Sequence, residues 1–179
     1  IAELTADNQV SVRVHPTLIS RQHPLASVRN AFNAVFVEAE SAGELMFYGR
    51  GAGGAPTASA ILGDLIAIAR NKTRGGEGHG EGDYAELAIA PIDNVRSRYL
   101  IRLDVADKPG VRATVAQLFA SNSVSIETVR QSGRGDSAEL IVATHSAPES
   151  SLKKTVASLA QSDVVKNVES VLRIEGSAK

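Results

Sequence analysis

The second half of the sequence contains one arrangement twice, in which strand-like runs flank a helix-like run. Residues 99–105 alternate apolar and polar side chains, as a strand with one buried face does. In residues 111–119, and again in 152–160, apolar side chains recur at steps of three and four, which indicates a helix with one buried stripe. Further strand-like runs lie at 124–129, 138–145 and 165–174. The resulting order β-α-β-β-α-β predicts a ferredoxin-like fold, in which a four-stranded sheet carries both helices on one face.

Both helices of this pattern are preceded by a tetrapeptide that favours a helix start. The first is DKPG, in which Pro109 fixes the turn and Gly110 permits a tight approach to the helix. The second is SAPE, in which Ser146 and Glu149 have the spacing of a capping box. We therefore expect Ser146 to cap the second helix.

A glycine-rich segment separates this half from the first. Residues 71–84 read NKTRGGEGHGEGDY, with five glycines among charged side chains, and such a run cannot bury an apolar face. We therefore divide the chain into residues 1–70, a linker at 71–95, and a second domain at 96–179.

The first half has a coarser pattern. Alternating valines predict a strand over residues 10–14 that stops at Pro16. Two apolar runs, 33–40 and 44–49, lie on either side of a short turn and predict an antiparallel hairpin. Residues 56–70 have helical periodicity with one apolar face. The predicted fold class is mixed α+β: a partial sheet with one long helix, followed by the ferredoxin-like unit.

Composition excludes several classes of function. Hydrophobic residues make up 43% of the chain and charged residues 22%, which is typical of a globular protein. The net charge of −1 gives no electrostatic basis for binding nucleic acid or an anionic membrane, and no apolar run is long enough to span a bilayer. There is no cysteine, and the histidines show no spacing typical of metal ligands: His15, His23, His79 and His145. We therefore expect no metal and find no catalytic residue.

Gly49, Gly51 and Gly54 spell the G-x-G-x-x-G of a dinucleotide-binding turn. A working fingerprint also needs a second parallel strand that ends in an acidic residue, and here the helix runs into the glycine-rich segment instead. Two interpretations stay open. The glycines could form only a tight turn, or the helix start could favour an anion and complete a cofactor site whose main domain lies elsewhere.

Three segments together resemble the late catalytic region of homoserine dehydrogenase: HPLASV, NAVF and YGRGAGGAPTASA. This resemblance covers nearly all of residues 10–71. The segment RLDVADKPGV, in its β-α-β-β-α-β context, resembles an ACT regulatory domain, which many bacterial homoserine dehydrogenases carry at the C-terminus.

The resemblance implies that the chain is the C-terminal portion of an enzyme that interconverts L-homoserine and L-aspartate 4-semialdehyde in threonine, methionine and isoleucine biosynthesis. NAD or NADP would be bound mainly by a domain upstream of Ile1, together with the catalytic lysine and aspartate, so this piece is expected to be inactive by itself. The family's glycine loop maps the cofactor contact onto Gly51, Ala52 and Gly53. Arg50 departs from the family pattern, which commonly has proline there.

For the second domain, the resemblance implies binding of an amino-acid effector, with L-threonine as the expected one, and assembly into a dimer or tetramer in the cytoplasm. The effector-binding residues carried over are Asp107, Gly110, Val111 and Ile126. A zwitterion suits this place, because helix-start amides favour a carboxylate and Asp107 can accept from an ammonium. The alternative is a stand-alone amino-acid-sensing and dimerisation module without catalysis.

Overall fold

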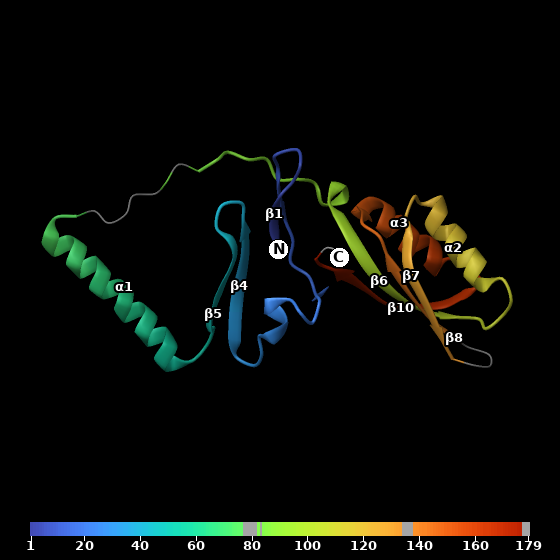
Figure 1. The fold of residues 1–179 in the computed structure, drawn as a ribbon, viewed down its shortest axis with the longest axis horizontal. Helices are drawn as coiled ribbons and strands as arrows, with labels where there is room; N and C mark the ends of the chain where they lie inside the picture. The colour runs from blue at the N-terminus through green and yellow to red at the C-terminus, as the bar shows by residue number, and fades with distance from the viewer. Residues whose placement is uncertain (77–81, 83, 134–137, 177–179) are drawn as a thin grey trace. The chain divides into compact units, whose positions relative to one another are not determined.

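The computed structural model describes residues 1–76, 82, 84–133 and 138–176. The chain forms two compact units, one made of Ile1–Ile19 with Leu87–Lys179 and the other of Ser20–Glu86. The predicted mixed α+β class is confirmed. The units differ from the division made on the sequence in two respects: residues 1–19 group with the C-terminal half, and the expected linker 71–95 is divided between the units at Glu86–Leu87. Figure 1 labels the helices and strands of both units.

The larger unit contains the predicted β-α-β-β-α-β order. Its elements are β6 (Arg96–Val105), α2 (Val111–Ser121), β7 (Ile126–Ser132), β8 (Ala138–Thr144), α3 (Glu149–Ala160) and β10 (Val165–Ile174). The strands lie in the order β10-β6-β8-β7, and all three neighbouring pairs are antiparallel. The ferredoxin-like prediction is therefore confirmed.

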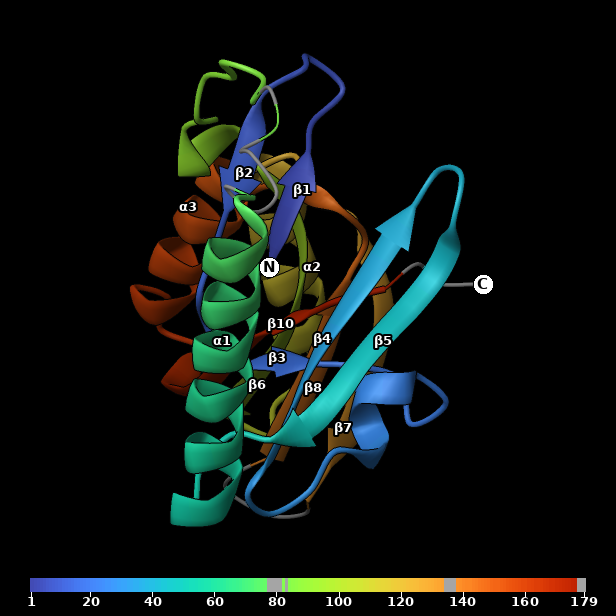
Figure 2. The ribbon, with the colours of Figure 1, turned by 90° about the vertical axis from the view of Figure 1, so that its left-hand side faces the viewer.

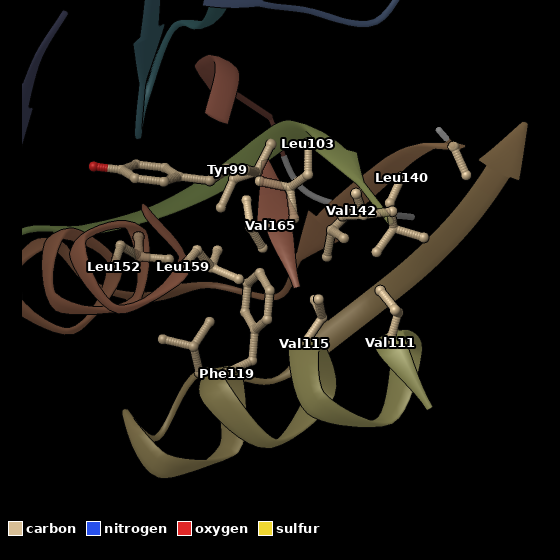
Figure 3. Close-up of a cluster of buried hydrophobic side chains, with 14 of the residues drawn as sticks. Tyr99, Leu103, Val111, Val115, Phe119, Leu140, Val142, Leu152, Leu159 and Val165 are labelled. Carbon is tan, nitrogen blue, oxygen red and sulfur yellow. The ribbon is translucent and has the colours of Figure 1, made fainter. Parts of the chain in front are cut away.

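The core of this unit lies between the sheet and its two helices (Figure 3). Phe119 and Val115 of α2 and Leu152 and Leu159 of α3 are at most 2% exposed. They pack with the inward-facing side chains of β6 and β8, which include Ile101, Leu103, Leu140 and Val142. The alternating and helical periodicities in the sequence thus correspond to the two surfaces that this core joins.

The expected Ser146 cap is wrong. The structure begins α3 at Glu149, with Pro148 before it and no side-chain cap hydrogen bond. Ala147–Pro148 form a short strand, β9, which pairs with the start of β6. Ala147 precedes a proline and is therefore pushed toward extended backbone, so it cannot be the first helical residue after a Ser146 cap.

Residues 1–19 form three short strands: β1 (Ala2–Leu4), β2 (Val10–Val12) and β3 (Thr17–Leu18). β1 and β2 pair with each other, whereas β3 runs parallel to β10 and extends the large sheet by one strand. The predicted strand over residues 10–14 is shorter than expected, and the side chain of Val14 is 99% exposed. A short 3-10 helix, η2 (Ile92–Asn94), leads into β6.

The smaller unit contains a 3-10 helix, an antiparallel hairpin and a long helix: η1 (Pro24–Ser27), β4 (Phe32–Ala39), β5 (Gly43–Arg50) and α1 (Gly54–Arg74). Figure 2 shows the two hairpin strands side by side, paired from Phe32 with Arg50 to Ala39 with Gly43. The predicted hairpin and helix are confirmed. α1 ends at Gly75, whose φ of +71° suits glycine.

The apolar side chains of α1 are not buried. Its large apolar residues are each at least half exposed: Ile61, Leu62, Leu65, Ile66 and Ile68. None of the helices in the described residues combines the length and apolar character that crossing a membrane requires. Within the part of the chain that the structure describes, the apolar face of α1 is thus exposed.

Candidate functional site

The turn between β6 and α2 adjoins a cavity of about 270 Å³. Its lining comes from α2 (Arg112, Val115, Ala116), from β7 (Ile126, Val129, Gln131) and from Leu140 of β8. Most of these side chains are apolar, and Arg112 and Gln131 are the polar ones. The cavity opens to solvent, because Arg112, Ala116, Val129 and Gln131 are exposed residues.

The turn itself has the geometry that the DKPG sequence demands. Gly110 has a φ of +90°, a left-handed conformation that L side chains rarely adopt, and its carbonyl accepts from the Thr114 amide at 3.0 Å to begin α2. Asp107 is exposed, and its Oδ1 accepts from the side-chain Nε2 of Gln131 at 3.3 Å. This hydrogen bond links the turn to the cavity lining.

The four residues predicted to bind an effector thus occupy different places. Ile126 lines the cavity, and Asp107 is one hydrogen bond from it. Gly110 shapes the turn. The Val111 side chain is 6% exposed and belongs to the core, so only its backbone is available to a ligand there.

The sequence reasoning did not single out Arg112, Val129 or Gln131. A register shift between Ile126 and Thr128 makes Val129 and Gln131, rather than Thr128 and Arg130, share a face with Ile126. Strict alternation along β7 would have placed Thr128 and Arg130 on the cavity face instead. Arg112 carries a weaker signal: it is the second residue of α2, and its side chain lines the same cavity as Ile126.

A second cluster of polar side chains is buried at the start of α3. Glu149 is fully buried and accepts from the Tyr99 hydroxyl and from Nε and Nη2 of Arg173, each at 2.8 Å. Burial raises the pKa of Glu149, but hydrogen bonds from Arg173, Ser97 and Tyr99 outweigh it and lower the pKa to about 2. Burial and the neighbouring Glu149 raise the pKa of Tyr99 to about 12. This cluster joins α3 to β6 and β10 and shares no residue with the cavity.

The glycine turn of the smaller unit joins β5 to α1. The Gly51 amide donates to the Ala31 carbonyl at 3.1 Å, and a Cβ added at Gly51 would lie 1.8 Å from Nδ2 of Asn33. Gly53 has a φ of +130° and precedes the first residue of α1, whose first turn contains no acidic side chain. Gly51, Ala52 and Gly53 therefore present backbone, without large side chains, at the start of a helix.

Arg50 is exposed beside this turn, and its guanidinium lies over an aromatic ring. Its guanidinium carbon lies 4.9 Å from the centroid of the Phe32 ring, and Phe32 stacks on Tyr48 with centroids 4.8 Å apart. Among the described residues, no group of three or more His, Asp or Glu side chains is placed to hold a metal ion. His79 lies outside the described residues.

Two family models match the chain: homoserine dehydrogenase over residues 1–66 and the ACT domain over residues 99–163. The homoserine dehydrogenase of Corynebacterium glutamicum is 55% identical over 166 residues, which cover 93% of this chain and 37% of that protein. The enzyme of Mycobacterium tuberculosis H37Rv is 51% identical over 175 residues, which cover 94% of this chain and 40% of that protein. The chain thus spans about 40% of the length of the curated relatives it matches.

Solved structures agree with these matches. The homoserine dehydrogenase of Thiobacillus denitrificans superposes with a TM-score of 0.86 at 32% identity, over 97% of this chain and 41% of that one. A structure of the S. aureus enzyme superposes with a TM-score of 0.62 at 23% identity and supports the fold alone.

Proposed function

Because residues 1–66 belong to the homoserine dehydrogenase family and residues 99–163 form an ACT domain, we propose that the chain serves an NAD(P)-dependent enzyme that interconverts L-homoserine and L-aspartate 4-semialdehyde. In this proposal residues 1–70 complete the catalytic and assembly region of the enzyme. Residues 71–95 link this region to the ACT domain, and residues 96–179 form the domain that regulates the enzyme's activity. The match over residues 1–66 favours this function over a stand-alone sensing module, which would have no use for that region.

The nicotinamide cofactor would accept or supply the hydride when bound, and most of its contacts would come from outside this chain. The residues present fit a backbone contact at Gly51, Ala52 and Gly53. Gly51 has no space for a side chain beside Asn33, and the first turn of α1 carries no acidic side chain that would repel a phosphate. We therefore propose that this turn closes one side of the nucleotide site, and that the chain alone does not turn over substrate.

The regulatory half would bind a small amino acid, with L-threonine as the proposed effector. The observation that carries this proposal is the cavity beside the Asp107–Gly110 turn. Arg112 can pair with an α-carboxylate and Asp107 can accept from the α-ammonium, while Val115 and Ile126 provide apolar contact for a short side chain. Binding there would bias the enzyme between active and inhibited arrangements, for which about 1–3 kcal/mol of coupling is sufficient.

The proposal also includes assembly into a dimer or tetramer in the cytoplasm. The exposed apolar side chains of α1, such as Leu62 and Leu65, support association, because contiguous apolar surface is usually covered.

Calorimetric titration of the chain with L-threonine tests the effector proposal, with L-lysine, L-methionine and L-isoleucine as comparisons. We expect saturable binding that is selective for threonine, and a loss of at least tenfold in affinity for Asp107→Ala and for Arg112→Ala. Lys108→Ala is the matched control, since Lys108 is exposed in the same turn but does not line the cavity. Equal affinity for threonine and lysine would refute threonine as the effector, and unchanged binding by both variants would show that this cavity is not the effector site.

A further inference from the structure

Residues 1–19 come before the hairpin and α1 in the chain, yet they lie in the same compact unit as the ACT domain. The chain therefore passes between its two units twice, once at Ile19–Ser20 and once at Glu86–Leu87. The first passage follows β3 directly, and the second follows the glycine-rich segment.

Backbone pairing fixes the first passage to the ACT sheet. Thr17 and Leu18 of β3 pair with Arg173 and Ile174 of β10, and the Glu175 amide donates to the Leu18 carbonyl at 2.9 Å (Figure 2). Farther back, Val10 of β2 donates to the Ala88 carbonyl and accepts from the Ala90 amide, both at 2.9 Å. Residues 1–19 are thus hydrogen-bonded both to the segment that precedes the ACT domain in the sequence and to the last strand of that domain.

Arg13 strengthens this attachment from within. Its side chain is only 3% exposed. Nη1 donates to Glu3 at 2.5 Å and to Ser11 Oγ at 2.9 Å, and Nη2 lies 3.7 Å from a Glu175 carboxylate oxygen. Glu3 and Ser11 belong to residues 1–19 themselves, and Glu175 is 41% exposed, so the Arg13–Glu175 pair makes a modest contribution to the attachment.

The strand that receives β3 also reaches the proposed effector turn. At its start, Val165 of β10 pairs with Val105 of β6, and the Ala106 amide just before the turn donates to Val164 at 3.1 Å. At its end, Ile174 pairs with β3. With a rise of about 3.3 Å per residue, this single strand covers about 30 Å between the two places.

We propose that β3, together with the Arg13–Glu175 pair, is the attachment through which the ACT unit (Ile1–Ile19 with Leu87–Lys179) holds the hairpin–helix unit (Ser20–Glu86). In the same proposal, a change at the effector turn reaches Ser20 through β10 and β3. This routing rests on the proposed effector function, whereas the attachment does not.

Cleavage of the second passage tests the attachment. A protease site inserted after Gly76 would cut the chain into residues 1–76 and 77–179, and the contacts of residues 1–19 would join the two pieces. We expect the two pieces to migrate together in gel filtration at low micromolar concentration. Arg13→Met should weaken their association roughly twofold to fivefold, because it removes the cation that faces Glu175, a partly exposed carboxylate on the other piece. Arg21→Met is the matched control at an exposed arginine of the other unit, and should change nothing.

The outcomes separate the parts of the proposal. Pieces that separate on cleavage of the unsubstituted chain would overturn the attachment, and unchanged association of Arg13→Met would overturn the role of Arg13. Should Arg13→Met lose its circular dichroism signal before cleavage, Glu175→Gln replaces it, with an expected weakening of roughly twofold to fivefold. For the routing, threonine should alter amide exchange in residues 10–19. Threonine binding without that change in exchange would overturn only the proposed route from the effector turn to Ser20. Absence of threonine binding would overturn both the effector function and this route. The cleavage experiment would still test the attachment.

Discussion

Glu149 offers the sharpest test of the forces that hold the ACT unit together. Its carboxylate is fully buried, and its pKa lies at about 2 instead of the ordinary 4.5. A difference of about 2.5 pKa units at 1.36 kcal/mol each corresponds to about 3 kcal/mol of stabilisation by the ionised form. Glu149→Gln keeps the shape of the side chain but removes the charge that pairs with Arg173. We therefore expect the variant to be less stable than the unsubstituted chain by about 3 kcal/mol at pH 7.

The pH dependence of this difference follows from the direction of the shift. Because the pKa of Glu149 is lower in the folded state, the ionised carboxylate stabilises the fold above the unfolded pKa, and the stabilisation is lost as the pH falls toward 2. At pH 3 the contribution should have fallen to about 1.4 kcal/mol. Glu149→Gln lacks this titration, so the gap between the two proteins should narrow by more than half between pH 7 and pH 3.

Urea unfolding followed by amide hydrogen exchange measures this gap, because peptides from β6 and β8 report on the ACT core separately from the hairpin–helix unit. Glu139→Gln serves as the control: Glu139 pairs with Arg102 on the exposed face of the sheet, and we expect no measurable change. Equal stability of Glu149→Gln and the unsubstituted chain at pH 7, or a gap that stays constant down to pH 3, would refute the reasoning.

Three further outcomes are expected. Tyr99→Phe removes the hydroxyl that donates to Glu149 and should lower the free energy of unfolding by about 1 kcal/mol in the same urea assay. In the unsubstituted chain, the raised pKa of Tyr99 should make stability fall as the pH rises from 10 toward the folded pKa of about 12. Tyr99→Phe should not show this fall. Phe119→Ala opens a cavity where the side chain is completely buried and should cost about 3–5 kcal/mol. Gly51→Ala forces Asn33 aside and should speed amide exchange in the hairpin, and adding Asn33→Ala should restore the original rate, since the clash is with that side chain.

The sequence was sufficient wherever one periodic pattern covered a whole element. The alternation in 99–105 and the three-and-four spacing in 111–119 correspond to β6 and α2, because each element buries a single continuous face. The hairpin followed from two apolar runs and a short turn. In each case the signal is local, and every residue of the element repeats it.

The features that the sequence did not reveal depend on contacts between distant residues. β3 has two residues and pairs with a strand more than 150 positions later, so no periodicity marks it. The shift in β7 moves Val129 and Gln131 onto the cavity face against the expected alternation. Glu149 has capping-box spacing from Ser146, but tertiary partners, Tyr99 and Arg173, take its carboxylate instead. The local capping preference of Ser146 and Glu149 is weaker than the interaction of the buried Glu149 carboxylate with Arg173, so the tertiary contact forms instead of the cap.

The placement of these residues also determines which experiments can separate binding from folding. Val115 and Leu140 line the cavity and belong to the core, so a change at either would alter stability and ligand contact together. Arg112 lines the cavity, and Asp107 accepts a hydrogen bond from Gln131 of its lining; both residues are exposed and neither belongs to the core. Surface substitutions of this kind usually change stability little. A loss of effector binding at Asp107 or Arg112, with urea unfolding unchanged, would therefore identify contact with the ligand, whereas the same loss at Val115 would not.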